Sequence, residues 1–260
     1  MKITTWNVNS VRQRLGHLLD FLKEAEPDVV CLQELKCADD AFPRAEVEAA
    51  GYTVATHGQK GFNGVALVAR GPLQDIRRGL PGEEPDAASR YIEALVPGPG
   101  GPVRVASIYA PNGNPQPGPK YDAKRVFMAL LAAHARTLIE SEATLVLAGD
   151  YNVIPEARDA ARPEAWVADA LFLPESRAML RGLETLGLVD ALRACDDRAG
   201  VYTFWDYQAG AWSRGDGIRI DHLLLSAQAA DRLVSTVVHK HVRGWDKPSD
   251  HVPVTVELLG

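Results

Sequence analysis

A carboxylate and a carboxamide follow the apolar run 144–148, where Gly149 leads into Asp150 and Asn152. The run has the length and β-branched content of a buried strand, so both polar groups would come from a rigid support. Gly, Asp and Asn also form ordinary turns, so this segment alone fits a turn and a site equally well. The same arrangement recurs at other predicted strand ends, and that recurrence favours a site.

Four further predicted strands carry polar side chains of this kind at one end. These are Asn7 and Asn9, Gln33 and Glu34, Tyr109 and Asn112, and Asp250 and His251, which precede the last strand. Asp221 adds a carboxylate within the apolar run 218–225, where it needs a partner because burying an unpaired charge is costly. Ligand sites in sheet proteins lie at strand ends, so we expect these side chains to gather in one place.

Each of these residues also has a purely structural interpretation. Asn7 fits a turn or a cap, Glu34 a solvated strand end, and Tyr109 an amphipathic packing residue. Asp221 could be held by the neighbouring Arg219 or His222, and His251 could be a core histidine with its hydrogen bonds satisfied. Taken together, these interpretations leave the shared placement at strand ends unexplained.

The donor set indicates metal-assisted hydrolysis of a phosphoester. Glu, Asp and Asn supply hard oxygen ligands suited to Mg²⁺ or Mn²⁺, and no Cys/His spacing in the sequence suggests zinc. A divalent cation can polarise a phosphoryl oxygen and stabilise the leaving oxygen. A carboxylate must then orient or deprotonate water, and a cation must meet the negative transition state. Asp150 and His251 are the candidates for these two roles.

The composition is that of an ordinary globular protein: 260 residues, 46% of them hydrophobic, with three cysteines that cannot all pair. The net charge of −6 argues mildly against a polyanionic substrate, so nucleic acid would bind a local surface. No stretch approaches the ~18 apolar residues of a membrane span, and the N-terminus lacks signal-peptide anatomy. We therefore expect an intracellular protein with no membrane partner.

Strands are the main elements that position these residues. Strand-like runs cover 2–7, 28–34, 64–69, 91–96, 103–109, 144–148, 219–225, 234–239 and 252–258. Helical periodicity predicts a first helix over 11–22, capped by Ser10 with Gln13 and stopped at Pro27. It predicts two more, around 123–138 and around 175–186, the last ending at Gly187. Without strict strand–helix alternation or a linker, we expect one domain over 1–260 with mixed sheets and helices outside.

The ordered motifs resemble the exonuclease III family of apurinic/apyrimidinic endonucleases, part of the endonuclease/exonuclease/phosphatase superfamily. The matching segments are 5–12, 27–36, 58–66, 109–113, 149–153, 218–221 and 248–251. The resemblance implies an α/β (α+β) fold, a four-layer sandwich of two mixed β-sheets packed face to face with helices outside. It implies a compact bacterial form that acts as a monomer in the cytoplasm, with the nucleoid.

The resemblance also implies an activity. A DNA repair nuclease of this kind uses Mg²⁺, for which Mn²⁺ substitutes, to cleave double-stranded DNA 5′ to abasic sites. Enzymes of this kind also act as 3′→5′ exonucleases and 3′-repair phosphodiesterases at duplex ends. Two alternatives remain open: a superfamily phosphodiesterase or phosphatase acting on a non-DNA phosphoester such as a lipid or inositol phosphate, and a non-catalytic DNA-binding relative.

Residue roles carry over motif by motif. Glu34 is implied as the central metal ligand, helped by Asn7 and Asn9, with Asp250 beside the metal. Asp150 is implied to orient or deprotonate the attacking water, next to Asn152. Tyr109 would contact the scissile phosphate. His251, oriented by Asp221, would stabilise the phosphate charge.

Substrate contacts are implied in the same way. Phe204, Ile218 and Ile220 match positions that line an apolar pocket for a base-free sugar, with Ile218 replacing an aromatic found in some relatives. Asn9, Lys60 and Trp212 are expected to bind substrate as well, whereas Trp205 fits the core. Candidate phosphate contacts are Lys60, Lys120, Lys124, Arg177 and Arg214, each of which equally fits a solvated surface.

Overall fold

Two six-stranded mixed sheets form the centre of the computed structural model, which describes residues 1–84 and 87–260. The first sheet has the order β11-β12-β1-β2-β4-β3 and the second β5-β6-β7-β8-β10-β9. The first comprises β1 (Lys2–Asn7), β2 (Val29–Gln33), β3 (Thr53–His57), β4 (Val65–Ala69), β11 (Leu233–Val238) and β12 (Val254–Leu258). The second comprises β5 (Gln74–Arg78), β6 (Tyr91–Val96), β7 (Val103–Tyr109), β8 (Leu145–Asp150), β9 (Val189–Asp190) and β10 (Asp221–Leu225).

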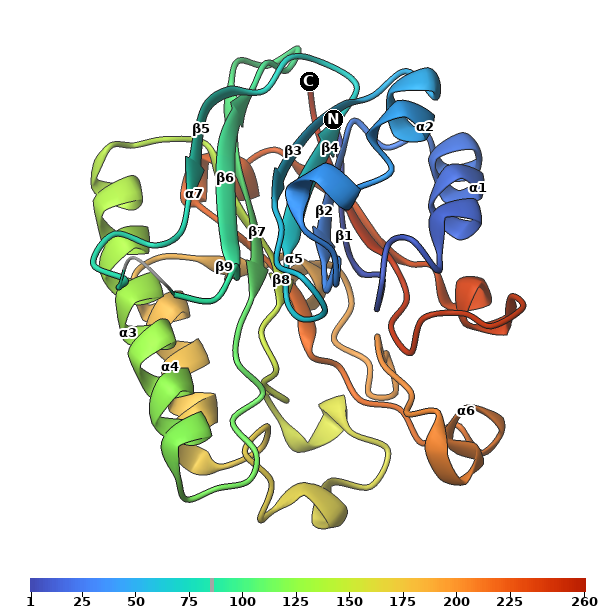
Figure 1. Ribbon diagram of the computed structural model, residues 1–260. Helices are drawn as coiled ribbons and strands as arrows, with labels where there is room; N and C mark the ends of the chain where they lie inside the picture. The colour runs from blue at the N-terminus through green and yellow to red at the C-terminus, as the bar shows by residue number, and fades with distance from the viewer. Residues whose placement is uncertain (85–86) are drawn as a thin grey trace.

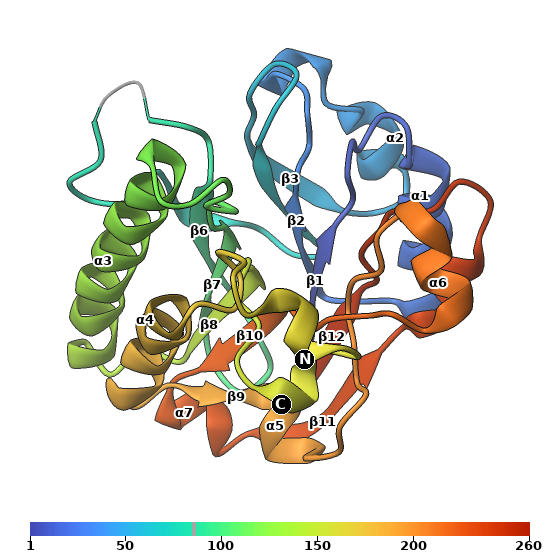
Figure 2. The same cartoon turned by 90° about the horizontal axis from the view of Figure 1, so that it is seen from below.

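The sheets pack face to face and the helices cover their outer faces (Figure 1; Figure 2). A buried aliphatic cluster drawn from both sheets, including Ile3, Val105 and Val146, fills the space between them. One outer face is covered by α1 (Leu15–Ala25) and α2 (Arg44–Ala49), the other by α3 (Pro119–Glu140) and α4 (Pro174–Thr185). The short helices are α5 (Ala191–Cys195), α6 (Ala211–Arg214) and α7 (Ala227–Ala230). The predicted four-layer sandwich is therefore confirmed.

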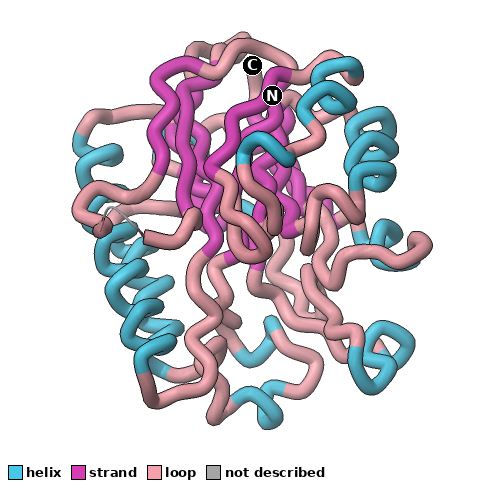
Figure 3. Tube along the Cα trace, viewed as in Figure 1, coloured by secondary structure: helices cyan, strands magenta, loops and turns pink. Residues whose placement is uncertain are grey.

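Strand direction explains why the polar strand ends meet at one edge. β1 and β2 run parallel in one sheet, as do β7 and β8 in the other, so their carboxyl ends lie at the same edge. β10 and β12 run antiparallel to these neighbours and begin where they end, so Asp221 pairs with Asp150 in register. Long loops cluster at this edge, at the bottom of Figure 3.

Most predicted elements are confirmed to within a few residues, but the predicted start of the first helix at residue 11, with Ser10 as its cap, is wrong. α1 begins at Leu15, and its N-cap residue Arg14 makes no side-chain cap bond. Ser10 lies outside the helix because its N–H donates to the carbonyl of Glu34, while that of Val11 donates to Leu35. Ser10 and Val11, predicted to start the helix, instead form backbone hydrogen bonds with the residues that follow β2. Within the described residues, no helix is long and apolar enough to cross a membrane.

Gly149 lies inside β8 and is required there for close packing of backbone. A Cβ at this position would collide with the carbonyl oxygen of Ile108 on β7 and lie 2.8 Å from its Cβ. The parallel pairing of the two strands therefore depends on glycine at 149. This pairing places Tyr109 beside Asp150.

Candidate active site

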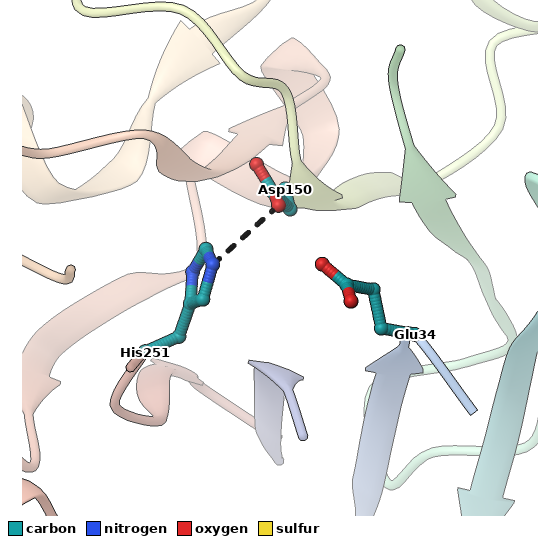
Figure 4. A group of neighbouring side chains, drawn as sticks. All are labelled: Glu34, Asp150 and His251. Carbon is teal, nitrogen blue, oxygen red and sulfur yellow. Dashed lines mark ion pairs between the residues drawn. The ribbon is translucent and has the colours of Figure 1, made fainter. Parts of the chain in front are cut away.

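Three ionisable side chains converge where the strands end. Glu34 follows β2, Asp150 ends β8 and His251 precedes β12, and their potential ligand atoms all lie within 4.8 Å of one another. Figure 4 shows the three side chains pointing toward a common space. His251 Nε2 lies 3.7 Å from Asp150 Oδ2, and both side chains are buried. Residues more than 200 positions apart thus form one cluster, as the strand-end pattern predicts.

Asn7 links the two carboxylates. Its Nδ2 donates to Glu34 Oε1 at 2.9 Å and to Asp150 Oδ2 at 3.0 Å, while its Oδ1 accepts the backbone N–H of Asn9. The Tyr109 hydroxyl donates to the same Glu34 oxygen at 3.0 Å. Glu34 itself adopts a left-handed backbone conformation (φ +53°), which is uncommon for a residue with a side chain. These contacts leave Glu34 little freedom to rotate away.

His251 is held by a carboxylate behind it. Its Nδ1 donates to Asp221 Oδ2 at 2.9 Å, and the same oxygen accepts the Thr203 hydroxyl at 2.6 Å. The alternative in which Arg219 or His222 pairs with Asp221 is wrong. Arg219 pairs with Asp159 and Asp190, and His222 contacts the Val153 carbonyl.

The local charges favour an imidazolium at His251. Burial opposes the charge, but Asp221 and Asp150 outweigh it and raise the pKa of His251 to about 10. Burial raises the pKa of Asp150 above its ordinary value, against the effect of His251. Burial also disfavours charge on Glu34, but hydrogen bonds from Asn7 and Lys36 prevail and lower its pKa. The cluster therefore combines an ionised Glu34, a protonated His251 and Asp150, a carboxylate that takes up a proton more easily than an ordinary aspartate.

Burial and the neighbouring carboxylates raise the pKa of Tyr109 well above its ordinary value. Its phenol therefore stays protonated and is available as a hydrogen-bond donor at the pocket.

This donor set fits a hard divalent cation. An imidazolium has no free lone pair, so His251 would not coordinate in its favoured state and the oxygens of Glu34 and Asp150 remain as ligands. Lys36 Nζ lies 2.9 Å from Glu34 Oε2, a cationic neighbour that sequence reasoning missed although it belongs to the motif around Glu34. Asn7 presents its nitrogen to the carboxylates, so in this geometry it orients them through hydrogen bonds.

The cluster opens into a cavity of about 380 Å³ that contains most of the predicted site. Tyr109, Asn152, Phe204, Ile220 and Asp250 line it together with Glu34, Asp150 and His251. The Phe204 ring meets the His251 imidazole edge-on at 4.9 Å. Asn152 donates its backbone N–H to Asp150 Oδ1 at 2.9 Å. Polar groups and the apolar side chains of Phe204 and Ile220 therefore both line the cavity.

Two further predicted residues lie at the rim. Asn9 Nδ2 donates to Asp250 Oδ1 at 3.0 Å, and Asn9 also contacts Lys36 and Tyr207. The Asp250 carboxylate thus accepts a hydrogen bond from Asn9, and Asp250 is not part of the cluster formed by Glu34, Asp150 and His251. Asp250 lines the cavity, whereas Asn9 is not among the lining residues of the described chain and reaches the site through Asp250 and Lys36.

The other predicted substrate residues are more scattered. Ile218 is buried beneath the cavity in an apolar cluster that Phe204 packs against. Trp212 packs edge-on against buried Trp205 at 5.0 Å. Lys60 is exposed in the loop after β3. Neither Trp212 nor Lys60 is among the residues that line the cavity in the described part of the chain.

The candidate phosphate contacts divide into exposed and buried side chains. Lys120 is exposed at the start of α3, Arg177 lies over Phe172, and Arg214 pairs with Asp216. The prediction for Lys124 is wrong, because its side chain is fully buried and its ammonium binds backbone carbonyls. A buried amine of this kind has no access to a DNA phosphate.

Sequence reasoning also missed several residues of the cavity wall: Asn114, Trp166, Asp169 and Leu171. They lie in the long connections that precede α3 and α4, Trp166 at the end of a short 3-10 helix (Pro163–Trp166), and their positions depend on how those connections fold back over the strand ends. Thr203 was missed too, although it directly precedes Phe204, which the sequence analysis singled out.

Comparison with known proteins gives a consistent result. Residues 4–251 match the model of the endonuclease/exonuclease/phosphatase family. Exodeoxyribonuclease III of Haemophilus influenzae is 34% identical, over 99% of this chain and 100% of that protein. A Neisseria 3′ phosphatase solved with a product DNA hairpin is 38% identical, covers 99% of both chains and has a TM-score of 0.95. An AP endonuclease from Archaeoglobus fulgidus is 34% identical, with a TM-score of 0.94 over 99% of both chains.

Proposed function

Because the chain belongs to the endonuclease/exonuclease/phosphatase family, we propose that its cavity hydrolyses phosphodiesters of double-stranded DNA, 5′ to abasic sites and at 3′ ends. The chain is a hydrolase with a DNA repair nuclease function, like its exodeoxyribonuclease III and AP endonuclease relatives. One observation carries the particular proposal: Asn7 bridges Glu34 and Asp150, while Asp150 faces His251.

The residues divide the reaction between them. Glu34 would hold Mg²⁺, with Asn7 fixing its carboxylate, while Asp250 lines the cavity and accepts a hydrogen bond from Asn9. When bound, Mg²⁺, or Mn²⁺ in its place, polarises a phosphoryl oxygen and stabilises the leaving oxygen. Asp150 orients the attacking water and takes its proton, a role suited to a carboxylate whose pKa burial has raised.

The remaining groups meet the negative charge of the phosphate. His251 is the principal cation, held in orientation by Asp221. Tyr109 donates a hydrogen bond from a phenol that stays protonated. Asn152 holds the water or a phosphate oxygen through its position beside Asp150.

The apolar side chains of the cavity would receive the sugar of an abasic nucleotide. Phe204 and Ile220 face the cavity, and Ile218 supports them from below. Lys60, Lys120, Arg177, Arg214 and Trp212 are proposed to contact the flanking duplex. We also propose that residues 1–260 act as a single catalytic domain and a monomer, on nucleoid DNA in a bacterial cytoplasm.

A gel assay of two DNA substrates tests the proposal. One duplex carries a single abasic site and the other a matched 3′ end, and each is incubated with Mg²⁺ and with EDTA. We expect cleavage of both with Mg²⁺ and of neither with EDTA. Equal or faster turnover of an inositol phosphate or phospholipid would favour the non-DNA alternative, and cleavage undiminished by EDTA would exclude the proposed metal role.

A further inference from the structure

Lys124 on α3 is a fully buried lysine next to the active site. Its Nζ donates to the carbonyl of Asn152 at 2.6 Å, of Asn112 at 3.1 Å and of Ala170 at 3.2 Å. An ammonium has three N–H donors and no acceptor, so these three carbonyls satisfy it completely. The three oxygens come from three chain segments: Asn112 lies between β7 and α3, whereas Asn152 and Ala170 lie near the two ends of the connection between β8 and α4.

No carboxylate among the described residues lies within ion-pair distance of this ammonium, although a buried charge normally needs a partner. Burial lowers the pKa of Lys124 to about 7, while the charges of Asp150 and Asp169 oppose that shift. Three carbonyl acceptors require three N–H groups, so the ammonium is the form that fits this site. The lysine thus serves as an internal cation coordinated by backbone oxygens.

The surrounding loop is shaped around the lysine stem. Gly113 has a left-handed backbone (φ +95°), and a Cβ there would lie 2.9 Å from Lys124 Cδ and 3.1 Å from the Ala170 Cβ. A side chain at 113 would therefore push apart two of the loops that the ammonium joins. The close packing of the Lys124 stem against the backbone therefore depends on glycine at position 113.

All three segments carry groups that border the catalytic cavity. Asn112 and Asn152 line it directly, and Leu171 follows Ala170. Asn152 adopts a left-handed backbone (φ +50°), and its N–H donates to Asp150 Oδ1 while its carbonyl accepts from Lys124. A single residue therefore separates the buried ammonium from the carboxylate that faces His251.

We propose that Lys124 is a positioning residue, whose buried ammonium joins the three segments and holds Asn152 in register with Asp150 for the hydrolytic step. The proposal rests on the proposed nuclease function. It assigns Lys124 no contact with DNA. It predicts that loss of the ammonium lowers kcat while DNA binding, which uses the outer surface, is retained.

The test compares two substitutions of Lys124 with two controls on a duplex that carries one abasic site. Lys124→Met removes the charge but closely matches the stem, and Lys124→Arg keeps a cation and N–H donors in a poorer fit. Ser176→Ala removes a neighbouring hydrogen bond to the same Ala170 carbonyl. Arg136→Met removes an exposed cation from the same helix. Thermal unfolding and circular dichroism are measured for every variant.

We expect kcat of Lys124→Met to fall ~100-fold, the cost of a misplacement of about 1 Å, with KM changed less than about threefold. Lys124→Arg should retain more activity than Lys124→Met, and both controls should keep kcat within about twofold of the parent. A role in packing alone predicts the reverse order, with Met the better tolerated substitution.

Two results would overturn the inference: a folded Lys124→Met with kcat within about twofold of the parent, or arginine faring worse than methionine. If the methionine variant does not fold, Lys124→Gln takes its place under the same criterion. Failure of the parent protein to cleave DNA would instead refute the proposed function. An active parent with an equally active neutral variant would refute only the role of Lys124.

Discussion

Replacing Asp221 with Asn tests whether His251 works as a cation. The two side chains have nearly the same shape, so the substitution removes a charge 2.9 Å from His251 Nδ1 and leaves an oxygen for the Thr203 hydroxyl. Burial of His251 is unchanged and continues to disfavour the imidazolium. The variant therefore isolates the electrostatic role of Asp221 from its role in packing.

The size of the effect follows from the pKa of His251. A rise from 6.5 to about 10 corresponds to roughly 5 kcal/mol in favour of the imidazolium. Asp221 is the nearest anion, so we assign it roughly 3 kcal/mol, which would return the pKa to about 8. At about pH 9 the charged fraction would then fall about tenfold, in addition to any loss from misorientation of the ring.

The assay is the pH dependence of kcat on a duplex with a tetrahydrofuran analogue, which resists alkaline strand scission. We expect the alkaline limb of the parent near pH 10 and that of Asp221→Asn near pH 8 or below, about two pH units lower. Asp190→Asn is the matched control, because it neutralises a buried carboxylate that pairs with Arg219 outside the cavity. Profiles of the same shape for the parent and Asp221→Asn would refute the reasoning.

Three further predictions follow from the same structure. Burial lowers the pKa of His222 to about 4, so its contribution to stability is present above about pH 6.5 and lost as the pH falls toward 4. In urea unfolding, the free energy of unfolding should fall less between pH 6.5 and 4 in His222→Gln than in the parent, by up to roughly 3 kcal/mol. An equal fall in both proteins would contradict this. Gly149→Ala should destabilise by about 3 kcal/mol or more, because its Cβ meets the β7 backbone, whereas Gly182→Ala in open space on α4 should stabilise by up to about 1 kcal/mol. Thermal melts that rank the two glycine variants alike would count against the packing argument. Glu34→Gln should weaken Mn²⁺ binding at least tenfold in a titration, or about 1.4 kcal/mol, and unchanged affinity would exclude Glu34 as the main ligand.

The strands with strong apolar runs could be predicted from the sequence, because their burial on both faces leaves a continuous hydrophobic signal. β6 and β7 occur at the predicted residues. β5 was missed because all its residues are exposed and only Ile76 is apolar, so its pairing with β6 leaves no hydrophobic pattern. The start of α1 was missed because a long-range backbone hydrogen bond from Ser10 to Glu34 overrides a local capping pattern.

The polar centre of the site could be predicted because strand direction alone brings its members together. Asn7, Glu34, Asp150 and His251 needed no knowledge of the loops. The cavity wall was harder, since the place of Trp166 depends on how residues 152–173 fold back. Lys124 was misassigned for the same reason: a lysine on an amphipathic helix is expected to be exposed, and its burial depends on how the β7–α3 and β8–α4 connections fold over it.

The central claim is that Asp150 drives hydrolysis at this cluster, and single-turnover cleavage of an abasic duplex by Asp150→Asn tests it most directly. Asn keeps the shape and can still accept the Asn152 N–H, but it cannot take a proton from water. We predict a cleavage rate lowered by ~10³-fold or more, with DNA affinity within about threefold of the parent. A folded variant that cleaves within about tenfold of the parent rate would contradict the account.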